Sequence, residues 1–245
     1  MSTRRNPGIT NNGTKKNKEH NLNFEKMKKL LSILAFCAAT MAFTSCDTGT
    51  SSTWTPLTPT EKAACFSQVA GTYNGKMMYY SVSDSAKSAT TDTLKVSWTI
   101  GTGLGADTTV TVNNIPVAII AKYISEEKVS KALATNEGTM QLKSPMYFYQ
   151  TSPAAFLLQP EVVKCPITYD GGSHTISLYF YQSTISAVTS YGFFNTSQNA
   201  LRMDFLLGGY KLDATDNSSK DLKTLSYKVN GRSYSYAPLV FVATK

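Results

Sequence analysis

Apolar and polar residues alternate along short segments of the chain from about residue 61 to residue 245. In residues 94–100 every second residue is Leu, Val, Trp or Ile, and the residues between them are Lys, Ser and Thr. Residues 201–207 carry Leu, Met, Phe and Leu at every second position, against Arg and Asp. Because successive side chains of a strand point to opposite faces, this pattern predicts strands with one face in a core and the other in water.

The same pattern predicts further strands, and turn sequences separate several of them. Asp170-Gly171-Gly172 and Asn230-Gly231 are typical of tight hairpin turns, in which glycine accepts a left-handed backbone. Short strands joined by turns predict a mainly β fold, an antiparallel barrel or sandwich, and argue against a parallel sheet interleaved with helices. The further strands are predicted over residues 73–83, 108–113, 140–150, 162–169, 174–181, 222–229 and 233–244.

A pair of short helices is predicted around residues 116–134. Asn114 can cap the first helix and Pro116 suits its first turn, while Ser125 can cap the second. Apolar residues recur at helical spacing in both segments. We expect the pair to cover one end of the β structure, and a further helical turn over residues 61–69 to pack beside the first strand.

The N-terminal part of the chain has the anatomy of a secretory signal. Two lysines follow Met27, and an apolar run covers residues 30–43. That run is shorter than the roughly 20 apolar residues that cross a bilayer, so we expect residues 27–45 to be removed. Residues 46–60 are rich in Thr, Ser and Pro and should form a flexible tether, which leaves residues 61–245 as a single β-rich domain.

The signal resembles that of bacterial lipoproteins, because the small residues Thr44 and Ser45 directly precede Cys46. The resemblance implies that Cys46 becomes the first residue of the mature protein and carries acyl chains. Such chains would hold the protein on a membrane of the cell envelope, which we expect to be the outer membrane, without spanning it. The alternative is an ordinary signal cleaved near Ser45, which would leave Cys46 as a thiol.

The basic charge of the chain lies mostly before Cys46. The whole sequence has a net charge of +8, but eight of its 24 Lys and Arg residues and two of its 16 acids precede Cys46. The mature part therefore has 16 basic and 14 acidic residues, a net charge of +2, and gives no support for nucleic-acid binding. Residues 1–26 are too long and polar for a signal n-region, so we expect translation to start at Met27 and these residues to be a non-native extension.

A second resemblance lies where the first predicted strand begins. Residues 66–73, Phe-Ser-Gln-Val-Ala-Gly-Thr-Tyr, resemble the start of calycin barrels, where a short helix leads into Gly-x-aromatic, with Tyr73 in place of the Trp usual in lipocalins. Together with the signal, the tether and the helical pair, the chain is similar to uncharacterised Bacteroidetes lipoproteins that carry domains of unknown function. This resemblance implies an envelope protein with a β-rich fold and supplies no catalytic residues.

The residues that commonly carry catalysis are sparse. His174 is the one histidine of the mature part and has no nucleophile motif near it, and Cys65 and Cys165 lack the short spacing of zinc ligands. The adjacent acids Glu126 and Glu127 fit the first turn of a helix, where negative charge is favoured. We therefore expect no catalytic residues, no metal, no cofactor and no enzymatic activity, with a carboxylate-based hydrolase as the weaker alternative.

Cys65 and Cys165 remain after processing, in a compartment where disulfides persist. They are candidates for a disulfide, and burial as two small apolar side chains is the alternative. Aromatic residues cluster in the predicted strands, and their outward rings are candidates for recognition, with core packing as the alternative. The candidate recognition residues are Tyr79, Tyr80, Tyr147, Tyr149, Tyr179 and Tyr181. Ser85, Thr93 and Thr108 each follow Asp in tripeptides that resemble the Bacteroidetes O-glycosylation signal.

These observations favour a lipid-anchored, non-enzymatic envelope protein whose β domain binds a small apolar ligand, a saccharide or another envelope protein. A fimbrial or adhesin-type subunit is the alternative; it would pair its terminal strand, residues 233–244, with a neighbour.

Overall fold

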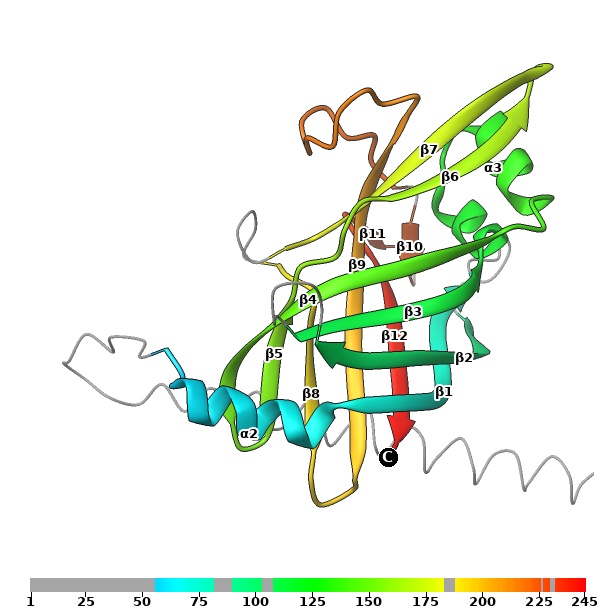
Figure 1. Cartoon of the computed structure of the whole chain (residues 1–245). Helices are drawn as coiled ribbons and strands as arrows, with labels where there is room; N and C mark the ends of the chain where they lie inside the picture. Colours follow the sequence, from blue (N-terminus) through cyan, green and yellow to red (C-terminus); the bar gives the residue numbers. More distant parts are fainter. Residues whose placement is uncertain (1–55, 82–89, 103–107, 183–187, 226, 230–231) are drawn as a thin grey trace, which may run out of the picture. The chain divides into compact units, whose positions relative to one another are not determined.

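The computed structural model describes residues 56–81, 90–102, 108–182, 188–225, 227–229 and 232–245 (Figure 1). The chain divides into two compact units, Met1–Trp54 and Thr55–Lys245, and all of the described residues belong to the second. The predictions for the signal, for Cys46, for Ser85 and for the Asn230-Gly231 turn fall outside the described residues.

The described residues are mainly in strands and include three short helical elements. The helices are α2 (Pro59–Val69), the 3-10 helix η1 (Val117–Tyr123) and α3 (Glu127–Ala134). None of the helices in these ranges is both long and apolar enough to cross a membrane. The strands are β1 (Gly71–Ser81), β2 (Thr90–Thr102), β3 (Thr108–Pro116), β4 (Thr139–Thr151), β5 (Ala154–Leu158), β6 (Val163–Tyr169), β7 (Gly172–Phe180), β8 (Tyr191–Asn195), β9 (Ala200–Leu212), β10 (Tyr227–Val229), β11 (Arg232–Tyr234) and β12 (Ala237–Thr244).

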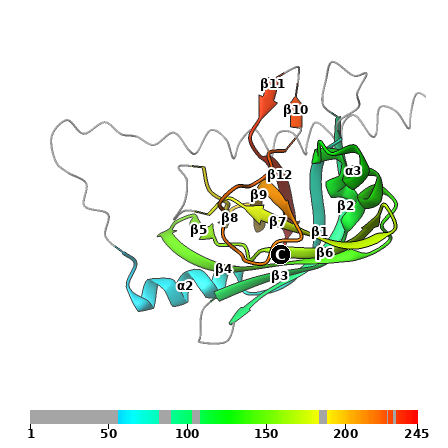
Figure 2. The ribbon, with the colours of Figure 1, turned by 90° about the horizontal axis from the view of Figure 1, so that it is seen from above.

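Eight antiparallel strands close into a barrel in the order β12-β1-β2-β3-β4-β5-β8-β9, and β9 pairs back to β12 (Figures 1 and 2). The closing strand β12 pairs with β1 around Lys76 and Val242, and with β9 from Ala237 opposite Leu207 to Thr244 opposite Ala200. The antiparallel β fold is therefore confirmed, and of the two predicted architectures the barrel is the one that forms.

The hairpin of β6 and β7 extends the sheet beyond the barrel. Strand β9 is long enough to serve both parts, because its residues 200–204 pair with β8 and its residues 207–212 pair with β7. Asp170 and Gly171 have φ angles of 50° and 75°, so the turn between β6 and β7 has the left-handed backbone that the Asp-Gly sequence predicts.

Aromatic side chains fill the inside of the barrel. Trp98 is 1% exposed and stacks on Tyr73 with ring centroids 5.5 Å apart, and Phe241 meets the indole edge-on at 6.0 Å. Phe205 contacts Phe241 at 5.3 Å from the neighbouring strand. An eight-stranded barrel is just wide enough for side chains to fill, and these rings occupy that space.

A capping box begins helix α2. The Thr58 hydroxyl accepts from the Glu61 amide, and the Glu61 carboxylate accepts from the Thr58 amide at 2.8 Å. The helix buries Cys65 and Val69, and the Tyr73 hydroxyl donates to the Val69 carbonyl at 2.7 Å. The predicted helical turn over residues 61–69 is thus confirmed, and the Tyr73 bond ties it to the start of β1.

The predicted helical pair is present, but its first member and both predicted caps differ. Residues 117–123 form a 3-10 helix, and Asn114 belongs to β3, where its φ of 58° lies in a register shift of that strand. The N-cap of α3 is Glu126, one residue after Ser125, and its side chain makes no capping bond. Helix α3 packs against η1 and β6 where the β6–β7 hairpin projects (Figure 1).

Two strand predictions also need correction, and two strands were not predicted. The segment 222–229 is a strand only over Tyr227–Val229, and the segment 233–244 is divided between β11 and β12. Strands β5 and β8 lie in segments where the alternation predicts no strand. Both complete the barrel wall between β4 and β9.

Candidate binding face

Three of the six candidate recognition tyrosines lie on the outside of the β structure. Tyr147 is 45% exposed on the outer face of β4, and Tyr149 lies half-buried two positions further on. Tyr181 is half-buried just after the end of β7. Adjacent strand residues point to opposite faces, which is why Phe148, between the two β4 tyrosines, is buried inside the barrel.

The other three tyrosines are engaged within the protein. Tyr179 is 5% exposed and its hydroxyl donates to the Asp216 carbonyl at 3.3 Å, so the expectation that it is an outer recognition ring is wrong. Tyr79 and Tyr80 pack partly buried against the core, and the Lys122 ammonium lies 5.3 Å from the centre of the Tyr79 ring.

The outer tyrosines of β4 adjoin two aromatic residues of β8. Tyr147 pairs with Leu157 of β5, and Leu157 pairs with Tyr191. Phe193 lies two positions after Tyr191 on the same outer side, with the small residue Ala155 opposite it on β5. The rings therefore share the outer side of one wall, made of β4, β5 and β8.

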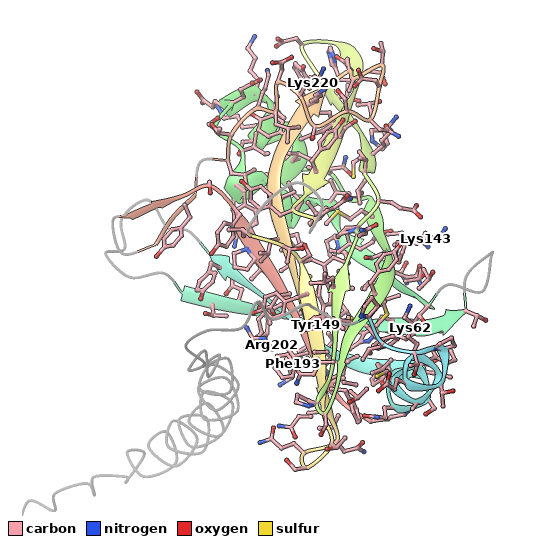
Figure 3. The ribbon with its side chains drawn as sticks, turned by 90° about the vertical axis from the view of Figure 1, so that its left-hand side faces the viewer. Lys62, Lys143, Tyr149, Phe193, Arg202 and Lys220 are labelled. Atoms are coloured by element: carbon pink, nitrogen blue, oxygen red, sulfur yellow. The ribbon has the colours of Figure 1, made fainter. Side chains whose placement is uncertain are left out.

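An ion pair of β9 continues this row. Tyr191 pairs with Asp204 and Phe193 pairs with Arg202, so the two charged residues lie directly beside the two rings. Arg202 donates from Nε and Nη2 to the two carboxylate oxygens of Asp204, both at 2.8 Å. Figure 3 shows Tyr149, Phe193 and Arg202 on the same side of the barrel. We call Tyr147, Tyr149, Tyr191, Phe193, Arg202 and Asp204 the outer aromatic face.

The ion pair also fixes the ring of Tyr191. The side chains of Asp204 and Arg202 are only 8% and 19% exposed. In this partly desolvated position the bidentate hydrogen bonding strengthens the ion pair. The Tyr191 hydroxyl is hydrogen-bonded to the same carboxylate, and burial raises the pKa of Tyr191 well above that of a free tyrosine. The hydroxyl end of this ring is therefore tied down beside Asp204.

The charges of this wall are balanced. Arg202 is neutralised by Asp204, and on the neighbouring part of β4 Lys143 pairs with Glu161 at 3.3 Å. A ligand that meets this face therefore meets rings and paired charges, with no excess of one sign.

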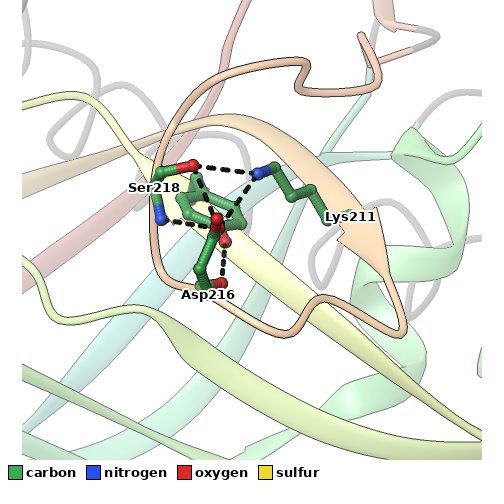
Figure 4. Close-up of polar contacts among 4 residues, drawn as sticks. Lys211, Asp216 and Ser218 are labelled. Carbon is green, nitrogen blue, oxygen red and sulfur yellow. Dashed lines mark hydrogen bonds and ion pairs between the residues drawn. The ribbon is translucent and has the colours of Figure 1, made fainter.

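A second polar group fastens the segment that follows β9 (Figure 4). The Lys211 ammonium lies 3.4 Å from the Asp216 carboxylate and 3.3 Å from the Ser218 hydroxyl. Hydrogen bonds from the Ser218 hydroxyl and amide, followed by Lys211, lower the pKa of Asp216. The Lys211 ammonium lies 5.8 Å from the centre of the Tyr179 ring, and the Tyr179 hydroxyl donates to the Asp216 carbonyl, so the group acts as a clamp over Tyr179.

His174 has a partner that local sequence patterns do not reveal. Its Nδ1 lies 2.8 Å from Asp213 Oδ2, and the Thr175 amide donates to the other oxygen of Asp213 at 2.8 Å. The hydrogen bond with His174 is the main cause that lowers the pKa of Asp213. The Tyr169 ring stacks on the imidazole at 4.0 Å between centroids. Together these contacts fasten the end of β9 to the start of β7.

The candidate disulfide between Cys65 and Cys165 does not form, because both thiols are free and buried. Cys65 contacts the carbonyl of Gln150 near the end of β4. Cys165 lies on β6. Four residues before it, the Glu161 amide donates to the Lys143 carbonyl in the first half of β4. Those two β4 positions are roughly 20 Å apart at the rise of a strand, far more than a disulfide spans. Burial raises the pKa of Cys165 to about 11.

Glu126 and Glu127 begin α3 and both make ion pairs, Glu126 with Lys223 and Glu127 with Lys131. Within the part of the chain that the structure describes, no group of three or more His, Cys, Asp or Glu residues is placed to hold a metal ion. Of the two described candidates for glycosylation, Thr108 begins β3 and Thr93 is exposed on the outer face of β2.

Comparison with known proteins gives a family match. Residues 68–212 match the family described as "Domain of unknown function (DUF4840)", which covers more than half of the chain and nine of the ten strands of the main sheet in full. No curated protein and no solved structure matches the chain.

Proposed function

The chain belongs to the DUF4840 family of domains of unknown function, and from that premise we propose that it is a lipid-anchored, non-enzymatic binding module of the cell envelope, whose outer aromatic face binds a neutral saccharide. The observation that carries the proposal is the row of outward rings on β4 and β8 beside the Arg202–Asp204 pair. A binding surface of this kind combines large rigid rings with a few fixed polar groups.

The chemistry of a sugar ring matches that row. A sugar presents C–H groups on its face, which pack on an aromatic ring, and hydroxyls at its edge, which bond to planar polar side chains. The balanced charges of the wall favour a neutral ligand over a strongly acidic or basic one. The packed aromatic core inside the barrel, around Trp98 and Phe241, is the reason for placing the site outside.

The anchor is supported by the sequence before the domain. Residues 27–46 have the lysines, apolar run, small residues and cysteine of a lipoprotein signal. The change Cys46→Ala should abolish labelling with a radioactive fatty acid and move the protein from the membrane fraction to the soluble one. A Cys46→Ala variant that is still acylated would contradict the anchor.

Strand addition is less well supported. The terminal strand β12 already pairs with β9 along its whole length and with β1 around Phe241. A hydrolase is also less well supported, because most described carboxylates, Asp204 among them, are held in ion pairs.

The saccharide proposal can be tested with the full chain expressed in its host and purified in detergent. Titration calorimetry with neutral glucan, mannan and galactan oligosaccharides should detect binding to at least one of them. The change Tyr147→Ala, which removes the most exposed ring of the face, should weaken that binding by about tenfold.

The matched control is Tyr169→Ala, which removes a tyrosine ring from β6, where it stacks on His174. This control should leave the affinity unchanged. Absence of binding to every neutral oligosaccharide, or equal losses in the two variants, would refute the proposal.

A further inference from the structure

A second group of aromatic rings lies further along β9, beside Leu206 and Gly208. Tyr181 meets Tyr236 edge-on with ring centroids 6.1 Å apart, and Tyr236 meets Tyr234 in the same way at 6.4 Å. The Tyr181 hydroxyl donates to the Ser235 carbonyl at 3.5 Å, and Tyr234 is 37% exposed. We call Tyr181, Tyr234 and Tyr236 the tyrosine cluster.

Gly208 of β9 makes room for this cluster. A β carbon at this position would lie 3.3 Å from the Tyr181 ring, so the ring rests directly over the backbone of β9. Gly208 is on the outward row of β9 that also contains Arg202, Asp204 and Leu206, of which Asp204 and Leu206 are buried on the outer side, whereas Leu207 packs in the core of the barrel.

Strand β9 therefore connects the tyrosine cluster to the outer aromatic face. Tyr181 donates its amide to the Leu206 carbonyl at 2.8 Å, and the Ser190 hydroxyl joins the two by donating to the Tyr181 carbonyl and accepting from the Leu206 amide. Ser190 directly precedes Tyr191, so the rings of Tyr181 and Tyr191 belong to one hydrogen-bonded junction of β7, β8 and β9.

The outward row between the two groups is short and uncharged. From Asp204, the last residue of the outer aromatic face on β9, to Gly208 the strand rises by roughly 13 Å. The row there holds only Gly208 and Leu206, which is 6% exposed. Pro238 of β12 pairs opposite Leu206. Because Leu206 is covered, a ligand that follows β9 would make its contacts with the rings at the two ends of this row.

We propose that the outer aromatic face and the tyrosine cluster are two ends of one elongated site along β9, and that its ligand is a neutral oligosaccharide chain of several sugar units. This inference rests on the saccharide proposal above and adds the length of the ligand. A single sugar covers one ring, so only a chain can use two ring groups separated by the rise of four strand residues, from Asp204 to Gly208. The two groups then act as linked contacts whose contributions combine within one ligand.

The test is a length series of the oligosaccharide that binds, from the monosaccharide to the hexasaccharide, measured by calorimetry on the detergent-purified full chain. Affinity should rise with length until both ring groups are covered. The change Tyr236→Ala should weaken binding of the hexasaccharide about fivefold to tenfold and leave that of the disaccharide unchanged. Tyr234→Ala is the second variant, because its exposed ring can be removed with less risk to folding.

The outcomes separate this inference from the function on which it rests. If no saccharide binds, both fall. If the disaccharide and the hexasaccharide bind with equal affinity, or if Tyr236→Ala and Tyr234→Ala leave the hexasaccharide affinity unchanged, the elongated site is refuted while saccharide binding at the outer aromatic face stands. A selective loss for the long ligand, with the melting temperature retained, supports the elongated site.

Discussion

Gly75 of β1 offers a direct test of the barrel seam. A β carbon at this position would lie 2.4 Å from the Val242 carbonyl oxygen, 2.5 Å from Trp98 Cη2 and 2.8 Å from the Ala243 β carbon. Non-bonded carbon atoms normally stay about 3.5 Å or more apart. The change Gly75→Ala therefore requires β1 and β12 to separate, or the indole of Trp98 to move.

Neither movement is easy. Trp98 is 1% exposed and is held between Tyr73 and Phe241, and Val242 contributes its backbone from the strand that closes the barrel. Overpacking of a core costs about 1–3 kcal/mol, and a clash with backbone places Gly75→Ala at about 3 kcal/mol of lost unfolding free energy. For a domain of this size the melting temperature should then fall by about 6–12 °C.

The matched control is Gly101→Ala in β2, where the added methyl group would meet no atom within 4 Å. Because alanine loses less backbone freedom on folding than glycine, this variant should be as stable as the wild type or more stable by about 0.5 kcal/mol. Urea unfolding followed by tryptophan fluorescence gives the midpoint and slope for each protein. If Gly75→Ala unfolds within about 0.5 kcal/mol of Gly101→Ala, the close approach of β1 and β12 described here does not exist.

Three further predictions concern single groups. Thr58→Ala removes the capping bond to the Glu61 amide and should lower the unfolding free energy by about 1 kcal/mol in urea, whereas an unchanged midpoint would show that the capping box contributes nothing. Cys65 and Cys165 should both be alkylated after unfolding without reductant and react slowly in the native protein; mass spectrometry that finds them linked would contradict the free, buried thiols. Burial raises the pKa of Tyr73 to about 12, so the folded protein holds the proton longer than the unfolded chain, and stability should fall as pH rises from about 10 to 12. This fall in the urea midpoint should be smaller in Tyr73→Phe, and an equal fall in both proteins would refute it.

The sequence predicts best those strands that have one face in the core and the other exposed to solvent. Trp98 and Phe205 sit in long alternating segments, and both are buried on the predicted side. Strand β5 shows no alternation, because four of its five residues are buried, and β8 has only five residues, of which the second is a glycine. The Phe156 ring of β5 fills the space on the inner side of Gly192. The inward position of β8 therefore carries no apolar side chain that the alternation could reveal.

The candidate site divides in a similar way. Tyr147 and Tyr149 were predictable as outward rings because a strand residue between them is apolar. The Arg202–Asp204 pair also has a local signal, since residues two apart on a strand share a face, but its place beside Tyr191 depends on which strands become neighbours. The partnership of His174 with Asp213 joins residues 39 positions apart, for which no local pattern exists.

The way the barrel closes has a consequence for how the protein matures. The Lys245 ammonium bonds to the Gln68 carbonyl, 177 positions away, and β12 joins β1 next to that contact. Contacts between such distant parts of a chain form late and slowly in folding. For a chain exported as we propose, the barrel cannot close until its last strand has crossed the membrane, so the polypeptide stays unfolded, and suited to transport, during its passage.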